Sequence, residues 1–488
     1  MRPLAVVFCA LVAAGCAPAL QPQHGAGEPA ARIPSTSRYP HLQHAIDDCL
    51  PDSLFPPSNA AVRVVSLTRG EPLYDLNGAL AFNPASNEKL FTSACALDVL
   101  GASHVFRTRV FADTASPPRI IIRGAGDPLL NTRNLDTLAA VLRATLPRES
   151  TWTVAGDLTF FDDLPRGPGW AWDDEPDPTA MFISPLSLNS NTVGVTVRPG
   201  GKTGDSARVE IDPPTSYVGL DNEAVTDTAG ARSTIDVSRN WREHLNTITV
   251  KGKIPPQDTA ETTTISVADP HWYALTVFRE KLEAWGVRCS GLILDTVPHG
   301  APEFGSCEHR LDSVLVFMNN ESDNLSAENI LKTIAAEKTG LPGSTAGGAG
   351  FVKLFLAAAG VDTTTIVIAD GSGVSRYNLT TAGTITALLG AMKKRSDIFP
   401  AWYASLPVAG KSGTIARRMR GTPAEGNLRA KTGTLEGVSS LSGYVTTADG
   451  EELAFSILMQ NYPSHAGAYR RVQDRIGELL AGVRRGEF

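Results

Sequence analysis

The spacing of hydrophobic and polar positions changes several times along the chain, and each change predicts a different kind of element. Two short alternating runs, at residues 60–68 and 72–77, predict a pair of strands joined by a turn. Apolar residues then recur at helical spacing over residues 85–100, and Gly101 follows where the helix should end. A hairpin followed by a helix is therefore expected early in the folded chain.

The middle and the end of the chain have different patterns. Residues 106–269 consist mostly of short alternating runs separated by Gly, Pro, Asn and Asp, which is typical of β structure. Beyond them, helical spacing and alternating runs both return. The expected helices are 272–285, 311–333 and 465–483, and the expected strands are 427–431, 438–446 and 452–459. We therefore expect helices and strands on both sides of a mostly β insertion.

Length and composition narrow the class of protein. A chain of 488 residues is long enough for about three domains. Hydrophobic residues make up 42% and charged residues 19%, which is ordinary for a folded protein. The formal net charge is -7 and the sequence has no basic block, so a nucleic-acid partner is not expected.

The first residues have the pattern of an export signal. Arg2 precedes an apolar run that is too short to cross a bilayer, and the small residues before Cys16 resemble a bacterial lipobox. We therefore expect a lipoprotein-like signal at 1–16, a flexible tether at 17–39, and a protein that works in the periplasm or cell envelope. Two alternatives stay open: a lipid anchor at Cys16, or simple secretion after a later cleavage.

Four cysteines remain beyond the signal, namely Cys49, Cys95, Cys289 and Cys307. An oxidising compartment permits disulfides, and Cys289 and Cys307 flank a loop rich in Pro and Gly. A disulfide between these two and a pair of free thiols are the alternatives. The sequence has no C-x-x-C, H-E-x-x-H or calcium-loop pattern, so we expect no metal and no other cofactor.

One serine in the chain precedes a lysine by three positions, in Ser86-x-x-Lys89. Positions three apart lie on one face of a helix, so Lys89 can reach the Ser86 hydroxyl. A lysine can remove the serine proton only if burial and a second cation lower its pKa. The motif alone also fits a polar first turn of an amphipathic helix.

A second candidate is Ser322-Asp323-Asn324, one of three S-x-N triplets in the chain. It is the triplet that lies within a helical pattern and can present Ser322 and Asn324 at a turn beside a pocket. A helix cap with polar neighbours is the alternative interpretation.

The K-T-G triplet occurs three times, and its context separates the copies. The copy at Lys202 follows a Pro-Gly-Gly turn, and the copy at Lys338 ends a helix; a K-S-G variant at Lys411 has no strand alternation after it. Lys431-Thr432-Gly433-Thr434 lies on a strand-like run that two more runs follow. Such a strand can bind a peptide backbone, Gly433 allows close approach, and Lys431 supplies the second cation.

In this order, the three triplets resemble the signature of penicillin-binding proteins and serine β-lactamases. The long separation of the first two triplets implies a large insertion, as in the class C low-molecular-mass penicillin-binding proteins, the D-alanyl-D-alanine carboxypeptidase/endopeptidase family. Further matching segments, which extend the resemblance from about residue 60 to the last helix, lie at 83–86, 169–174, 186–189, 370–373, 406–410 and 430–433. The chain departs from the family pattern at Lys411-Ser412, which follows the matching segment 406–410. The family usually has an Asp before the glycine at this place.

The resemblance implies an α/β (α+β) fold. A β-lactamase/transpeptidase-like catalytic domain would comprise residues 40–105 and 270–488. A large, mostly β insertion of two nested domains would occupy residues 106–269.

The resemblance also implies roles for the site residues. Ser86 would attack the carbonyl between the two terminal D-alanines of a peptidoglycan stem peptide, with Lys89 as base. Ser322 would relay a proton to the leaving amine, and Asn324 would fix Lys89 or the substrate amide. Lys431 would supply the second positive charge of the site. Thr432 and Thr434 would bind the terminal carboxylate, and the backbone N–H groups of Ser86 and Thr434 would form the oxyanion hole.

Two further residues would recognise the peptide: Asp174 the side-chain amino group of diaminopimelate, and Arg376 a carboxylate. For Asp174, an acceptor that only stabilises its loop is the alternative. Penicillin would trap Ser86 as an acyl-enzyme. Two other functions stay open: a serine β-lactamase, and a catalytically silent peptidoglycan-binding envelope protein, although binding alone does not require Lys89.

Overall fold

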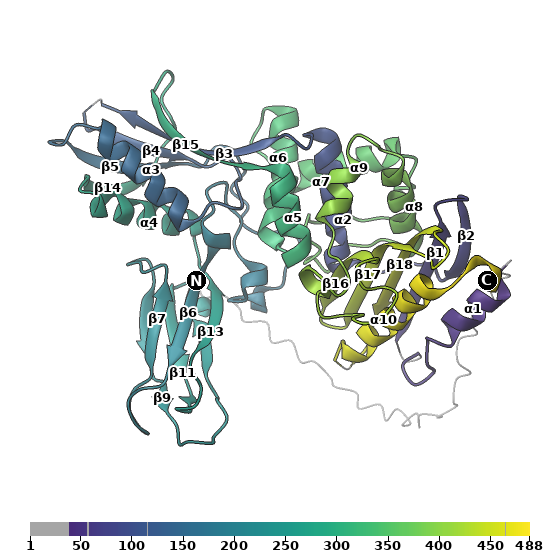
Figure 1. Cartoon of the computed structure of the whole chain (residues 1–488). Coiled ribbons are helices and arrows are strands. Elements are labelled where there is room, and N and C mark those ends of the chain that lie inside the picture. The colour runs from purple at the N-terminus through teal and green to yellow at the C-terminus, as the bar shows by residue number, and fades with distance from the viewer. Residues whose placement is uncertain (1–38, 56–57, 115, 464) are drawn as a thin grey trace, which may run out of the picture. The chain divides into compact units, whose positions relative to one another are not determined.

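The computed structural model describes residues 39–55, 58–114, 116–463 and 465–488, which form a mixed α/β fold (Figure 1). The expected export signal, Cys16 and nearly all of the tether lie outside the described residues. Within the described ranges, no helix combines the length and the apolarity that crossing a bilayer requires.

The sheet of the expected catalytic domain, called the catalytic sheet, contains strands from both the start and the end of the described chain. Its five strands have the order β16-β17-β18-β1-β2 and every neighbouring pair is antiparallel. The strands are β1 (Asn59–Ser66), β2 (Glu71–Leu76), β16 (Arg429–Leu435), β17 (Val438–Thr446) and β18 (Glu452–Gln460). The expected hairpin and the three expected C-terminal strands are all present, shifted at their ends by up to four residues.

Alternation along β18 explains why the sheet carries helices on both faces. Leu453, Phe455 and Ile457 pack with α1 (Pro40–Asp47) and α10 (Gly467–Gly482). The intervening Ala454 and Leu458 face the other way, into a core built with the remaining helices. Successive side chains of a strand point to opposite faces, so this almost continuous apolar strand is buried on both sides. Figure 1 shows α10 lying along one face of the sheet.

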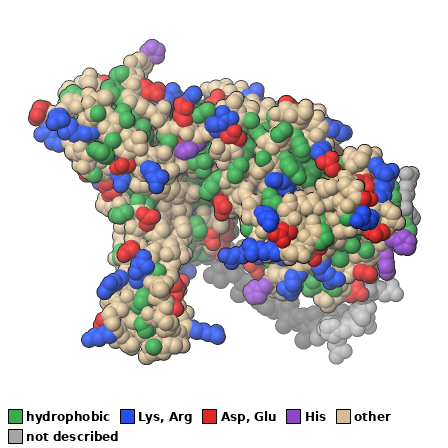
Figure 2. Space-filling view, in the orientation of Figure 1, with side chains coloured by type: hydrophobic (Ala, Val, Ile, Leu, Met, Phe, Trp, Pro, Cys, Tyr) green, Lys and Arg blue, Asp and Glu red, His purple; other side chains and the backbone are tan. Residues whose placement is uncertain are grey.

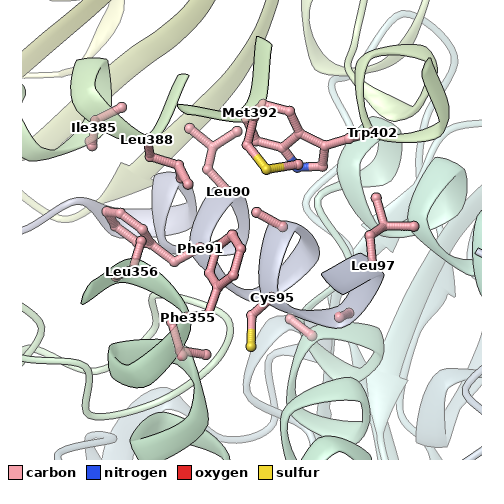
Figure 3. Close-up of a cluster of buried hydrophobic side chains, with 14 of the residues drawn as sticks. Leu90, Phe91, Cys95, Leu97, Phe355, Leu356, Ile385, Leu388, Met392 and Trp402 are labelled. Carbon is pink, nitrogen blue, oxygen red and sulfur yellow. The ribbon is translucent and has the colours of Figure 1, made fainter. Parts of the chain in front are cut away.

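Helix α2 (Glu88–Val99) occupies the middle of the second core. In Figure 3, Leu90, Phe91 and Leu97 project from it toward side chains of the surrounding helices. Those helices are α5 (Leu311–Glu321), α6 (Asn324–Thr339), α7 (Thr345–Ala358), α8 (Ala382–Lys393) and α9 (Phe399–Ser405). Burying each large apolar side chain contributes about 1.5–3 kcal/mol, so this core holds the start of α2 in a fixed position.

A second five-stranded sheet, of order β14-β5-β4-β3-β15, lies in the inserted part of the chain. Its strands are β3 (Val105–Asp113), β4 (Arg119–Arg123), β5 (Thr151–Asp157), β14 (Arg288–Leu294) and β15 (Glu303–Arg310). Helices α3 (Thr132–Thr145) and α4 (Pro270–Ala284) pack against it.

The structure differs from the expected insertion at its end and adds a helix to it. Because β14 and β15 pair with β5 and β3, the inserted sheet continues past residue 269, where the insertion was expected to end, to Arg310. The stretch expected to be mostly β also contains α3. Asn131 caps this helix by accepting hydrogen bonds from the backbone N–H groups of Arg133 and Asn134 at 3.0 and 3.2 Å.

Residues 192–266 form three smaller sheets within the insertion. One has the order β13-β6-β7, one β10-β11-β8, and one pairs β12 with β9. Their strands are β6 (Thr192–Arg198), β7 (Arg208–Asp212), β8 (Gly219–Asn222), β9 (Val225–Thr226), β10 (Asp236–Arg239), β11 (Thr247–Lys251), β12 (Lys253–Ile254) and β13 (Glu261–Ser266). The core of this segment is continuous with that of the second sheet.

The proposed disulfide between Cys289 and Cys307 is wrong. Cys289 lies on β14 and Cys307 on β15, which are opposite edges of one sheet with three strands between them. Strands about 4.8 Å apart place the two edges roughly 19 Å from each other, whereas a disulfide needs Cα atoms within about 7 Å. All four cysteines of the described residues are free.

The surface agrees with the charge of the sequence. On the face shown in Figure 2, Lys and Arg side chains are interspersed with Asp and Glu.

Candidate active site

Ser86 lies in a single 3-10 turn, Ala85–Asn87, directly before α2. Ala85 has a left-handed backbone, with φ 46°, which is uncommon for a residue with a side chain. The Asn83 side chain holds this turn: its Oδ1 accepts from the Ala85 N–H at 2.8 Å, and its Nδ2 donates to the Ser375 carbonyl at 3.1 Å. The turn therefore holds Ser86 at the entrance of α2, as the motif predicts.

Lys89 lies one helical turn from Ser86 and is fully buried. Its Nζ donates to Ser86 Oγ at 3.0 Å, to Asn324 Oδ1 at 2.5 Å and to the Ser372 carbonyl at 2.7 Å. Burial lowers the pKa of Lys89 to about 8, although nearby carboxylates raise it in opposition. A pKa near 8 leaves roughly a tenth of the amine neutral at pH 7, and it is the neutral form that a general base requires.

The carboxylates around Lys89 are buried as well. Glu328 Oε1 accepts from the backbone N–H groups of Gly371 and Ser372 at 3.0 and 2.8 Å, and this places the Ser372 carbonyl against Lys89. Burial, and then the neighbouring Asp370, raise the pKa of Glu328 to about 8. Burial likewise raises the pKa of Glu88 well above its ordinary value. Burial therefore disfavours the charged form of Lys89 and of both neighbouring glutamates.

The second triplet lies at a break between two helices. Ser322 has φ 60° and ends α5, so the single helix expected over 311–333 is in fact two. Asp323 caps α6 by accepting from the Ser326 N–H at 2.7 Å. The two interpretations of this triplet, a helix cap and a serine presented at a turn, therefore occur together. Asn324 also donates from Nδ2 to the Thr179 carbonyl of the insertion at 2.6 Å.

Lys431 joins the second triplet to the third. Its Nζ donates to Ser322 Oγ at 2.8 Å and to the Thr432 carbonyl at 3.1 Å, and the side chain is fully buried. Burial, followed by the charge of Lys89, holds the pKa of Lys431 well below its usual value. Burial, one of the two causes expected for Lys89, is the main cause of the lowered pKa for both lysines.

Strand β16, an edge of the catalytic sheet, passes directly beside the serine. A Cβ added to Gly433 would lie 2.7 Å from the Pro84 carbonyl oxygen and 2.9 Å from the Ser86 nitrogen. Such distances are too short for any other residue without a shift of the strand. The close approach of β16 to the Ser86 turn therefore depends on glycine.

These groups open into a cleft of about 520 Å³. Ser86, Ser322, Asn324 and residues 432–434 line it, together with Asp174 and Arg376. Arg376 donates from Nη1 to the Glu436 carbonyl at 2.8 Å. Asp174 accepts from its own loop, at the Ala171 N–H, over 3.0 Å. Asp174 therefore stabilises its loop and also faces the cleft.

Two residues that contact the cleft threonines had no sequence motif to mark them. Thr414 Oγ1 lies 2.8 Å from Thr432 Oγ1, and Arg470 donates from Nη2 to Thr434 Oγ1 at 3.2 Å. Both come from segments that reach the cleft only through the tertiary fold, as does the carbonyl of Ser372. The sequence signal nearest to that carbonyl is the resemblance at 370–373, which implies no role for it.

The other lysine triplets take no part in the site. Lys202 lies exposed in a turn of the insertion. Lys338 is in the last turn of α6, which Gly340 ends with φ 68°. Lys411 forms a surface ion pair with Glu425 at 2.6 Å.

Comparison with known proteins gives a consistent result. A model of the D-Ala-D-Ala carboxypeptidase 3 (S13) family matches residues 42–483. A D-alanyl-D-alanine carboxypeptidase of Actinomadura sp. (strain R39) is 39% identical over 481 residues, which cover 93% of this chain and 87% of the relative. A second relative, DacB of Haemophilus influenzae, is 27% identical over 83% of this chain and 86% of its own. The crystal structure of penicillin-binding protein 4 from H. influenzae has the same fold, with a TM-score of 0.78, 24% identity, and coverage of 90% of this chain and 99% of that one.

Proposed function

The chain belongs to the D-Ala-D-Ala carboxypeptidase 3 (S13) family, and we propose that it hydrolyses the terminal D-Ala-D-Ala bond of peptidoglycan stem peptides through an acyl-enzyme on Ser86. It is a serine-type carboxypeptidase of the class C low-molecular-mass penicillin-binding proteins. One observation carries the proposed mechanism: Lys89 Nζ lies 3.0 Å from Ser86 Oγ while two further acceptors hold it in place.

In the acylation step, neutral Lys89 takes the Ser86 hydroxyl proton as the oxygen attacks the carbonyl carbon between the two D-alanines. A base held within hydrogen-bond reach of a serine contributes about 10²–10⁴-fold to the rate. The buried position of Lys89 supports this role, because it keeps the amine neutral often enough to accept the proton.

The leaving D-alanine needs a proton on its nitrogen. Ser322 delivers it, and Lys431 at 2.8 Å replenishes the Ser322 hydroxyl. The proton that Lys89 took from Ser86 then passes to Lys431, so that both lysines regain their starting charge. Water next attacks the ester carbonyl of the acyl-enzyme, and Lys89 takes one proton from the water and gives it to the Ser86 oxygen as the ester bond breaks. The products are D-alanine and the shortened peptide.

The charge that develops on the carbonyl oxygen requires donors fixed in advance. The backbone N–H groups of Ser86 and Thr434 serve as the oxyanion hole, and the tight packing of Gly433 against the Ser86 turn supports this assignment. Losing one such donor typically costs about 10²–10³-fold in rate. Thr432 and Thr434 bind the terminal carboxylate.

Asp174 and Arg376 recognise the rest of the stem peptide. Both line the same cleft as Ser86, and their opposite charges suit the amino and carboxylate groups of a diaminopimelate side chain. Asp174→Ala is the test: it should lower the rate for a peptide with a free side-chain amino group more than for its acylated form. An unchanged ratio of the two rates would reject the role of Asp174.

We also propose that the protein acts in the cell envelope and cleaves cross-linked peptides. The signal-like residues 1–16 support export to the periplasm or cell envelope, with a lipid anchor at Cys16. Cross-linked peptides are cleaved by the same chemistry, because the amino group that leaves then belongs to a neighbouring stem. β-Lactams inhibit by acylating Ser86.

Digestion of purified muropeptides tests the proposal. Monomers ending in D-Ala-D-Ala should lose one D-alanine, dimers should be split, and Ser86→Ala should do neither. Release of no D-alanine by folded wild-type protein would reject the carboxypeptidase activity. Cleavage of monomers alone would reject the endopeptidase activity.

A further inference from the structure

A second group of reactive side chains lies away from the cleft, in the inserted sheet. Asp127, Cys307 and His309 each offer one potential ligand atom, and these atoms all lie within 4.8 Å of one another. His309 Nδ1 is 2.9 Å from Asp127 Oδ2. None of the three residues contributes to the cleft or to the proposed acyl transfer.

Two elements build this cluster. Cys307 and His309 are two positions apart on β15, so both side chains point to the same face of the sheet. Asp127 comes from the loop after β4, and its Oδ1 accepts from the Leu129 N–H at 3.0 Å, which fixes the carboxylate. The carboxylate is 1% exposed and the imidazole 22%, so the cluster is shielded on one side and reaches solvent on the other.

The neighbouring backbone is held tightly. A Cβ added to Gly126 would lie 2.6 Å from the Phe161 ring and 2.8 Å from Thr333 Oγ1 of α6, so the Asp127 loop is wedged against the catalytic core. On the other side, β15 leads directly into α5, whose last residue precedes Ser322. The cluster therefore joins the insertion to the helix that presents the second catalytic triplet.

The donor atoms suit one class of cation. Thiolate sulfur, imidazole nitrogen and carboxylate oxygen are together the ligands of tetrahedral divalent zinc sites, whereas Mg²⁺ and Ca²⁺ prefer oxygen alone. Ligand bonds of about 2.0–2.3 Å require neighbouring donors to be roughly 3.3–3.8 Å apart in a tetrahedron. The three ligand atoms lie within 4.8 Å of one another, so movements of up to roughly an ångström bring them to this spacing. A water molecule from the exposed side would complete the fourth position.

We propose that Asp127, Cys307 and His309 bind one Zn²⁺-class divalent transition-metal ion, which fastens the insertion to α5. Binding converts the Cys307 thiol to a thiolate and displaces the hydrogen between His309 and Asp127; these protons go to solvent, and no electron is transferred. The alternative is an ion pair of His309 with Asp127 beside an uninvolved thiol.

Cobalt binding distinguishes the proposed metal site from a simple ion pair of His309 with Asp127. Full-length protein is treated with a chelator, desalted and titrated with Co²⁺, while absorbance is followed for the thiolate-to-cobalt charge-transfer band in the near ultraviolet. One equivalent should saturate the band, and Zn²⁺ should displace it. Because loss of even an outer-shell partner costs about 10–100-fold in metal affinity, Cys307→Ser should remove the band and Asp127→Asn should weaken binding at least tenfold.

Cys289→Ser is the matched control, since Cys289 is a partly exposed free thiol on the opposite edge of the same sheet. It should keep both the band and the affinity. Penicillin labelling of Ser86 is measured on every variant, so that a misfolded protein is recognised independently of the metal. If Cys307→Ser does not label, melting curves of wild-type protein and Cys289→Ser with and without Zn²⁺ provide the second test, and both should melt at higher temperature with the metal.

Three results would overturn the proposal: no cobalt band in wild-type protein that labels normally, a band that survives in Cys307→Ser, or a Zn²⁺ melting shift absent from both wild type and Cys289→Ser. None of these results bears on the carboxypeptidase activity, which uses a separate set of residues.

Discussion

The Nζ of Lys431 lies 2.8 Å from the hydroxyl oxygen of Ser322, although 109 positions separate the two residues in the chain. The left-handed backbone of Ser322 at the end of α5 aims its side chain at the edge strand β16. Among the described residues, the hydrogen-bond partners of the Lys431 amine are the Ser322 hydroxyl and the Thr432 carbonyl, and burial lowers its pKa well below the ordinary range. A lysine of this kind exchanges protons readily, which suits a relay to the leaving group.

The pH dependence of acylation follows from Lys89. A general base must be neutral, and the neutral fraction of a lysine rises as pH rises through its pKa. Burial sets this pKa at about 8, so the acylation rate constant should rise over roughly one pH unit on either side of that value and level off above it. Stopped-flow kinetics with a chromogenic β-lactam measures the profile. A rate that is flat across this range, or that rises only near the pKa of a free lysine, would contradict the assignment.

We expect Asn324 to affect the rate of acylation because it fixes the position of Lys89. Asn324→Ala removes an acceptor at 2.5 Å from Lys89 Nζ and the link to the Thr179 carbonyl. Acylation should slow by about 10²-fold, because misplacing a catalytic group by an ångström has costs of that order. Asn320→Ala is the matched control: Asn320 donates to the Ser405 carbonyl, outside the cleft. Equal rates for the two variants would remove Asn324 from the mechanism.

Gly433→Ala should push β16 away from the nucleophile. The added Cβ would meet the Pro84 carbonyl oxygen at 2.7 Å and the Ser86 nitrogen at 2.9 Å. We expect a loss of about 1–3 kcal/mol in the free energy of unfolding and an acylation rate reduced by at least about 10²-fold, since an oxyanion donor is displaced.

Gly194→Ala is the control for this change. Gly194 also lies on a strand, but the nearest atom to a Cβ added there would be 3.6 Å away. Thermal melting and acylation kinetics of both variants are compared with wild type. If Gly433→Ala acylates as fast as Gly194→Ala, the close approach has no part in catalysis.

Arg470 should assist in binding the terminal carboxylate. Its guanidinium is exposed and donates to Thr434 Oγ1 at 3.2 Å, where the carboxylate of the substrate would lie. Arg470→Ala should raise KM about tenfold for a peptide with a free terminal carboxylate and leave the KM of the terminal amide unchanged, because one charge-assisted hydrogen bond is worth roughly 1.5–3 kcal/mol. Arg471→Ala changes the next exposed arginine and should affect neither substrate. An equal effect of Arg470→Ala on both peptides would exclude recognition of the carboxylate.

The sequence was sufficient to locate the elements that carry local signals. The serine–lysine pair, the caps at Asp323 and Gly340, and the three C-terminal strands all depend on nearby residues, and each lies close to its expected position. The end of the insertion was misplaced because β14 and β15 are half-exposed edge strands with little hydrophobic alternation. Helix α3 had an available signal, the cap at Asn131 followed by Leu135 and Leu138, which the surrounding strands outweighed.

The electrostatics of the site were not predictable in the same way. Glu88 is next to Lys89 in the chain, but Glu328 and Asp370 reach it only when α6 and the 370–373 turn pack against α2. No spacing rule relates these positions. The same is true of Arg470, which α10 brings beside β16.

The most direct test of the central claim is mass spectrometry of the intact protein after reaction with a penicillin, followed by peptide mapping. We predict a single adduct on Ser86 with the mass of the penicillin. The adduct should be absent from Ser86→Ala and should form far more slowly in Lys89→Ala. An adduct that survives Ser86→Ala, or that maps to another residue, would contradict the central claim.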